Sequence, residues 1–152
     1  MPIQESPQPS LAIISYAQAT ALIAAAVRTA AARSVKLGLV VLDAAGHLVA
    51  AGRMDGAPFI TTEVARGKAF ACVATGGQPG TNLAQRFEEN PMVWGNAGPL
   101  GYGAPLFPAQ GALPIHLDGV LVGAIGASGA PSAIDEAVIA EAIGAIGGSP
   151  TP

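Results

Sequence analysis

The side chains best suited to chemistry stand together in one short segment, Arg53-Met54-Asp55-Gly56. Only 11 % of the 152 residues are Asp, Glu, Lys or Arg, against about 25 % in an average soluble domain, so two neighbouring charges are informative. A guanidinium such as that of Arg53 binds carboxylates, and a carboxylate such as that of Asp55 can move a proton. The structural alternative is an internal ion pair or a turn, because Asp before Gly is common in turns.

A lysine and a cysteine follow in a segment with helical spacing. Lys68 has largely apolar neighbours, and Cys72 lies one turn later on roughly the same face of the predicted helix. A partly buried lysine loses its proton more easily, so Lys68 can act as a base or bind a carboxylate. We therefore predict that Lys68 and Asp55 are candidates for proton transfer. In the alternative, Lys68 extends its amino group to solvent and Cys72 is a small buried apolar residue.

The elements that must position these residues follow from hydrophobic periodicity and turn residues. A capping box between Ser15 and Gln18 starts the first helix, and Asp118-Gly119 predicts a tight turn in the second hairpin. The predicted elements are a helix over 16–35, strands over 39–42 and 47–54, helices from 61 or 62 to 75 and from 82 to 90, a loop rich in Gly and Pro over 92–110, strands over 112–117 and 120–127, and a helix capped by Ser132 that ends at Gly147-Gly148. This order predicts an α+β domain with a central, mainly antiparallel sheet flanked by helices.

Alternation along the first hairpin predicts which of its side chains lie together. Strict alternation puts His47, Val49, Ala51 and Arg53 on one face, and Leu48, Ala50 and Met54 on the other. The apolar side chains then pack on a core, whereas His47 and Arg53 project together. Gly52 predicts a bulge or a close approach by another backbone or a ligand.

Composition and charge limit the classes of partner. The net charge is −3 and the basic residues are scattered, so we expect no nucleic-acid binding. The single cysteine, Cys72, excludes an internal disulfide. The apolar stretch 11–27 is short and interrupted by polar residues, and no secretory signal is visible, so we expect no membrane contact and a cytoplasmic location. The scarcity of charge predicts that part of the surface is buried in a homo-oligomer.

Several motifs, taken in order, resemble the GlcG/HbpS-like family of small haem-associated proteins. They are the segments 41–49 (VLDAAGHLV), 53–57 (RMDGA), Lys68-Ala69, Leu113-Pro114-Ile115, 118–129 (DGVLVGAIGASG) and Asp135-Glu136. The resemblance covers most of a single expected domain, residues 11–147, between tails over 1–10 and 148–152 that we expect to be disordered. It implies a profilin-like, three-layer fold, assembly into homo-oligomers, and haem or another small molecule as ligand. Some members resemble extracellular haem-binding sensors, and others stand among catabolic enzymes.

This resemblance gives several residues a candidate role in ligand binding. Haem iron takes a His, Cys, Met or Tyr ligand, and its propionates take Arg or Lys, which Arg53 can supply. His47 and His116 are the only histidines, and each is either a ligand or an ordinary hydrogen-bonding residue. Trp94 and Tyr102 either stack on a flat ligand or anchor their loop. The sequence lacks the motifs of zinc, nucleophile and phosphate-loop sites, so we predict no metal-ion centre.

Three functions follow from these candidates. The main hypothesis is a small-ligand-binding protein of the haem-binding type, with its pocket between the end of the first hairpin, the second helix and the loop over 92–110. The alternative is a catabolic enzyme of isomerase or lyase type that acts on a small carboxylate or aromatic acid. There Arg53 holds the substrate, and Lys68, Asp55 or His47 moves a proton. A third hypothesis is an accessory subunit whose apolar helices mediate assembly.

Overall fold

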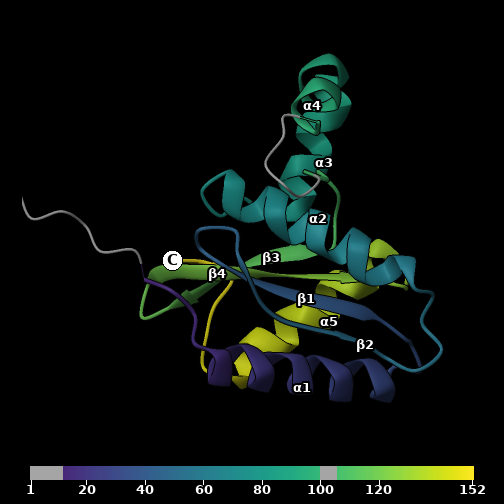
Figure 1. The fold of residues 1–152 in the computed structure, drawn as a ribbon, viewed down its shortest axis with the longest axis vertical. Helices are drawn as coiled ribbons and strands as arrows, with labels where there is room; N and C mark the ends of the chain where they lie inside the picture. The colour runs from purple at the N-terminus through teal and green to yellow at the C-terminus, as the bar shows by residue number, and fades with distance from the viewer. Residues whose placement is uncertain (1–11, 100–105) are drawn as a thin grey trace, which may run out of the picture.

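The computed structural model describes residues 12–99 and 106–152, which form three layers around one antiparallel sheet (Figure 1). The strands are β1 (Gly38–Asp43), β2 (Leu48–Arg53), β3 (Ala112–Leu117) and β4 (Val120–Ser128), in the order β2-β1-β4-β3. The helices are α1 (Tyr16–Ala32), α2 (Ile60–Ala74), α3 (Gly80–Glu89), α4 (Pro91–Ala97) and α5 (Ser132–Ala145). Helices α1 and α5 cover one face and α2 the other, whereas α3 and α4 rise beyond α2. The predicted α+β architecture is confirmed.

Two apolar clusters hold the layers together, one on each face of the sheet. In β1, Leu39 and Val41 belong to the cluster under α1 and α5, whereas Val40 and Leu42 belong to the cluster under α2. All six residues of β1 are buried, because this strand lies inside the sheet and is covered on both faces. The run of apolar residues that predicted β1 therefore reflects burial on two sides.

The start of α1 follows the sequence closely. Ser15 Oγ accepts a hydrogen bond from the Gln18 N–H at 3.1 Å, and Gln18 Oε1 accepts one from the Ser15 N–H at 2.9 Å, which confirms the capping box. The helix ends at Ala32, earlier than predicted, since Ser34 has a left-handed φ of 57° that stops helical propagation. Among the described residues, no helix combines the length and apolar character needed to cross a bilayer.

Three other helix positions differ from the prediction. Phe59 precedes α2 and Pro131 precedes α5, and neither start has a side-chain cap hydrogen bond, in contrast to the threonine and serine caps that we expected. The first part of the predicted loop over 92–110 forms the helix α4. Pro91 stands at its first position, where a proline is favoured because the N–H that it lacks would have no helical partner.

Strand β2 is an edge of the sheet and departs from strict alternation. Opposite β1, Val41 pairs with Ala50 and Leu42 pairs with Leu48, so Val49 is an extra residue in a bulge. Val49 and Ala50 both pack toward the cluster under α1 and α5, whereas Leu48 faces the side of α2. The bulge therefore changes which side chains of β2 share a face.

Close contact between α2 and the sheet fixes the distance between this helix and the sheet. A Cβ atom added at Gly126 would overlap the carbonyl oxygen of Ala65, and one added at Gly38 would overlap the hydroxyl of Thr61. The absence of side chains at both glycines lets α2 lie directly on β4 and β1. The position of every residue that α2 presents toward β2 depends on this contact.

The chain after α5 returns to the sheet. Ser149 and His116 exchange two backbone hydrogen bonds, at 2.8 and 2.9 Å, beside the outer edge of β3. This pairing differs from the disordered tail that we expected over residues 148–152. The other expected tail, over residues 1–10, lies outside the described residues.

Candidate functional site

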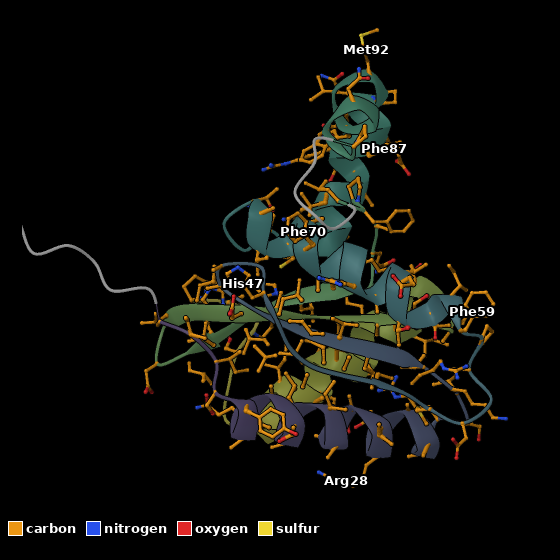
Figure 2. The ribbon with its side chains drawn as sticks, in the orientation of Figure 1. Arg28, His47, Phe59, Phe70, Phe87 and Met92 are labelled. Atoms are coloured by element: carbon orange, nitrogen blue, oxygen red, sulfur yellow. The ribbon has the colours of Figure 1, made fainter. Side chains whose placement is uncertain are left out.

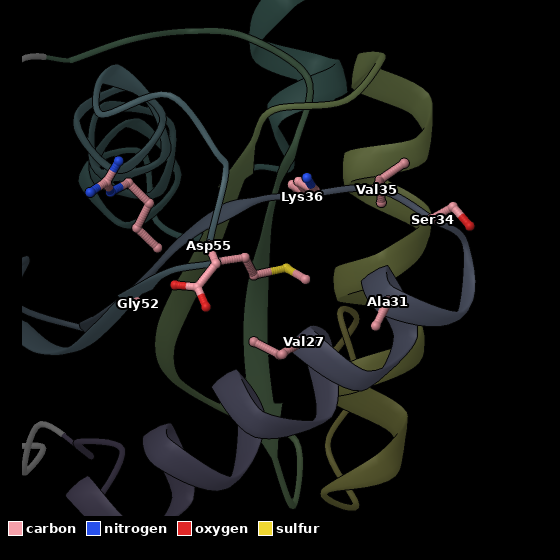
Figure 3. Close-up of a pocket in the computed structure, with 9 residues that line it drawn as sticks. Val27, Ala31, Ser34, Val35, Lys36, Gly52 and Asp55 are labelled. Carbon is pink, nitrogen blue, oxygen red and sulfur yellow. The ribbon is translucent and has the colours of Figure 1, made fainter.

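The largest of three described hollows lies between α1 and the end of β2 (Figure 3). It has a volume of about 620 Å³ and is open to solvent. Its lining residues are Val27, Ala31, Ser34, Val35, Lys36, Gly52, Arg53, Met54 and Asp55. In Figure 3, Val27 and Ala31 on α1 stand across the hollow from Asp55. An apolar wall with charged groups at its rim suits an apolar ligand that carries carboxylates.

Two smaller hollows lie on the other side of β2, toward α2. The second hollow measures about 310 Å³ and is lined by Val40, Leu48, Ala51, Gly52, Arg53, Thr62, Glu63 and Arg66. The third measures about 160 Å³ and is lined by Glu63, Val64, Gly67 and Phe107. These two hollows lie beside elements between which we predicted the ligand pocket, and that location stays a prediction. The larger first hollow shares only the end of the hairpin with the predicted location.

The hairpin end brings two predicted residues to these hollows. Arg53 lines the first and the second hollow, and Asp55 lines the first. Arg53 Nη1 donates a hydrogen bond to the carbonyl oxygen of Ala57 at 2.9 Å. Among the described residues, Arg53 and Asp55 form no ion pair, so that structural alternative does not apply. The turn does form, because Gly56 has a φ of 85° and the Ala57 N–H bonds to Met54 O at 3.0 Å.

Lys68 is buried, and its amino group already has partners. Only 5 % of Lys68 and 1 % of Asp135 is exposed, and Lys68 Nζ lies 3.5 Å from Asp135 Oδ2. Lys68 Nζ also donates to Ala127 O at 3.0 Å, and Asp135 Oδ1 accepts from the Ala130 N–H at 3.1 Å. Burial lowers the pKa of Lys68 and raises the pKa of Asp135, because desolvation outweighs the attraction between them. Lys68 lines none of the three hollows.

Cys72 has the properties of a small core residue. It is fully buried in the cluster between α2 and the sheet, together with Val40 and Ala124. Burial raises the pKa of its thiol to about 12. Because the reactive form of cysteine is the thiolate, this environment makes Cys72 chemically inert, as our alternative predicted.

His47 lies at the opposite end of β2 from Arg53. Its side chain is 81 % exposed, and its Nδ1 is 3.8 Å from Asp43 Oδ2. Figure 2 shows it beside the hairpin turn, near Phe70. Six residue-to-residue steps of extended chain separate His47 from Arg53, a distance of about 20 Å. The bulge at Val49 also breaks the alternation that placed these two side chains on one face.

The remaining candidates lie away from these hollows or outside the described residues. His116 is buried on β3, three strand spacings from β2 and therefore about 14 Å away. Its Nδ1 has no hydrogen-bond partner among the described residues. Trp94 is half-buried on α4, on the projection away from the sheet (Figure 1), and Tyr102 lies outside the described residues. The roles predicted for these residues stay predictions.

Three charged residues gained importance only from the structure. Lys36 and Arg66 line hollows, and Asp135 neutralises Lys68. The sequence could have identified Asp135 as the partner of Lys68. A lysine that is predicted to be buried needs an acidic partner, and few acidic residues lie in the apolar helices. Within the described residues, no group of three His, Cys, Asp or Glu side chains is arranged to hold a metal ion.

Comparison with known sequences agrees with the motifs described above. The family model described as "Haem degrading protein HbpS-like" matches residues 14–144. Protein GlcG from Escherichia coli is 34 % identical over 118 residues, which cover 76 % of this chain and 81 % of GlcG.

Solved structures extend the comparison to the fold. The crystal structure of a PduOC:Heme complex has a TM-score of 0.79 and 26 % identity, and the match covers 92 % of this chain and 99 % of PduOC. A double mutant of Streptomyces reticuli HbpS has a TM-score of 0.78 and 25 % identity, over 95 % of this chain and 96 % of HbpS. With the family model matching most of its length, this chain belongs to the HbpS-like family of haem-associated proteins.

Proposed function

We propose that this protein binds haem in the first hollow, between α1 and the end of β2. The observation that carries the proposal is the combination of an apolar cavity of about 620 Å³ with the cations of Lys36 and Arg53 among its lining residues. A haem presents a flat apolar body and two propionates, so it needs both features in one place. The PduOC:Heme complex shows that a relative of this fold binds haem, which supports the same ligand here.

The lining residues fit the requirements of haem. The volume falls in the range of about 300 to 1,000 Å³ that is typical of ligand pockets. Among the lining residues, Met54 has a side chain of a type that ligates haem iron, and its sulfur accepts a hydrogen bond from the Leu37 N–H at 3.4 Å. Haem supplies redox chemistry when bound, while the chain's residues bind and orient it. Ligation of the iron by His47 or His116 stays a prediction from the sequence.

A hemin titration with two matched variants tests this proposal. Ala31 lines the first hollow, whereas Ala24 lies exposed on the same helix and lines none of the hollows. Ala31→Phe fills the hollow and should weaken hemin binding at least about tenfold, measured by Soret absorbance, because a bulky ring replaces ligand contacts. Ala24→Phe has the same helix propensity cost and should leave the affinity unchanged. Equal affinities of both variants, or hemin binding no tighter than to an unrelated apolar protein, would contradict the proposal.

The alternative of a catabolic enzyme has less support from the contacts. It needs Lys68, Asp55 or His47 to move a proton on a substrate that Arg53 holds. The Lys68 amino group is held by Asp135 and by Ala127 O, and His47 lies at the opposite end of β2, so only Asp55 stands beside Arg53. We therefore propose binding in preference to proton transfer. The accessory-subunit hypothesis and the homo-oligomer also stay predictions, which exposed apolar residues such as Phe59 and Met92 support (Figure 2).

A further inference from the structure

The second hollow has features of its own that the haem proposal does not use. It lies across β2 from the first hollow, between this strand and the first two turns of α2. Val40, Leu48 and Ala51 give it an apolar side, and Arg53 and Arg66 give it two guanidinium groups. Its volume of about 310 Å³ is half that of the first hollow, which suits a much smaller molecule.

Both arginines lack an acidic partner among the described residues. The hydrogen bond of Arg53 goes to the carbonyl oxygen of Ala57, which leaves its charge uncompensated. Arg66 is half-buried, and its Nε is fully buried without a hydrogen-bond partner in the described part of the chain. A buried, charged donor without a partner destabilises the fold by about 1–3 kcal/mol or more, and an anion in the hollow would remove that penalty.

The third charged residue of this hollow limits the charge of its ligand. Glu63 lines the same cavity and forms no ion pair with Arg66 in the described structure. Two arginines against one glutamate leave one net positive charge on the lining. A single carboxylate matches that charge, and a guanidinium binds a planar carboxylate with two parallel hydrogen bonds.

We propose that the second hollow is a separate site for a small monocarboxylate with a compact apolar body. The carboxylate lies between Arg53 and Arg66, and the apolar body lies against Leu48 and Ala51. The features of the second hollow support this site without the haem proposal, although the two hollows share Arg53. The carboxylate is that of a free small acid or a propionate of a bound haem, and the two sources can be separated.

Benzoate and benzamide are suitable probes because they have the same ring and nearly the same shape, and only benzoate is charged. In titrations of the ¹⁵N-labelled protein without hemin, benzoate should shift the amide signals of β2 and of residues 62–66. Benzamide should leave them in place. If benzoate shifts these amide signals without hemin, the ligand is a free acid. If the signals shift only when hemin is added, the carboxylate in the second hollow is a haem propionate.

Four substitutions separate this site from the haem site. Arg66→Gln should weaken benzoate binding about tenfold and leave hemin affinity unchanged, and Lys36→Gln should weaken only hemin binding. Arg53→Gln should weaken both, because Arg53 lines both hollows. Glu63→Gln should strengthen benzoate binding, since it removes a like charge. Arg66→Lys keeps the charge without the planar fork, so it should fall between wild type and Arg66→Gln and serves as the variant if Arg66→Gln does not fold.

Two results would overturn this inference without affecting the haem proposal. The first is equal binding of benzoate and benzamide, and the second is unchanged benzoate affinity in both Arg66 variants. Conversely, hemin affinity could be unchanged in every variant while benzoate affinity depends on Arg66. That result would support the carboxylate site in the second hollow and refute the haem site in the first.

Discussion

The buried ion pair between Lys68 and Asp135 gives the sharpest test of how this fold is held together. It joins α2 and α5, which cover opposite faces of the sheet, at the end of β4. At 3.5 Å, Coulomb's law with an effective dielectric constant of about 20 gives an attraction of about 5 kcal/mol. Desolvation of each group outweighs this attraction, so the intact pair adds little net stability, but breaking it leaves a buried charge without a partner.

Lys68→Met and Asp135→Asn form a double-mutant cycle that measures this coupling. Asparagine keeps an oxygen that can accept from the Ala130 N–H, so Asp135→Asn removes mainly the charge. Each single variant should lower the free energy of unfolding by about 3–5 kcal/mol, and the double variant by about 1–2 kcal/mol. Urea denaturation measures all four proteins. If a single variant fails to fold, a folded double variant still shows that the two residues are coupled.

The pH dependence of stability gives an independent measurement of the pair. The pKa of Asp135 is raised from its ordinary value of 3.8, so the folded state holds the extra proton and stability falls as pH rises above about 4. The pKa of Lys68 is lowered from 10.5, so stability rises as pH approaches that value from below. The double variant should lack both slopes. A coupling energy below about 1 kcal/mol, or identical pH profiles, would refute the reasoning.

Two further predictions concern packing on α2. Gly126→Ala should destabilise the protein by more than about 2 kcal/mol in urea denaturation, because the new methyl group overlaps the Ala65 carbonyl oxygen and α2 must move. Gly144→Ala, in α5, is the control, because a Cβ atom there meets no atom within 4 Å. This substitution should raise the free energy of unfolding by about 0.5–1 kcal/mol, since alanine favours a helix more than glycine does. Equal effects at both sites would contradict the packing argument. The Cys72 thiol, with its pKa raised to about 12, should resist a disulfide reagent such as Ellman's reagent until urea unfolds the protein, and rapid labelling in native buffer would contradict its burial.

The sequence predicted the layers well because their signals are local. Helical spacing and the capping box at Ser15 located α1, and Asp118-Gly119 located the hairpin of β3 and β4. Those features depend on residues a few positions apart. The same local reasoning predicted at Gly52 a bulge or a close approach by another backbone or a ligand. The bulge occurs at Val49 instead, because its position depends on how β2 packs between two helices that are distant in sequence, whereas Gly52 lines the first and second hollows.

The site was harder to predict because its residues come from separate elements. Arg53 and Asp55 at the hairpin end both line the first hollow, and their roles toward a ligand stay predictions. The opposite wall of that hollow comes from α1, and nothing in the spacing of Val27 and Ala31 distinguishes a cavity wall from a core face. Lys68 was interpreted as a residue of the pocket because its partner, Asp135, becomes adjacent only in the folded chain.

The scarcity of charge in this protein helps to separate structural residues from those available to a ligand. Lys68 and Asp135 neutralise each other, and Asp43 accepts two backbone hydrogen bonds within the hairpin turn. By contrast, Lys36, Arg53 and Arg66 have no acidic partner among the described residues, and all three line hollows beside the edge strand β2. Because Asp55 and Glu63 in the same linings offset these cations only in part, each hollow keeps a net positive charge that suits anions. Both binding sites that we propose therefore depend on cations that the fold itself does not neutralise.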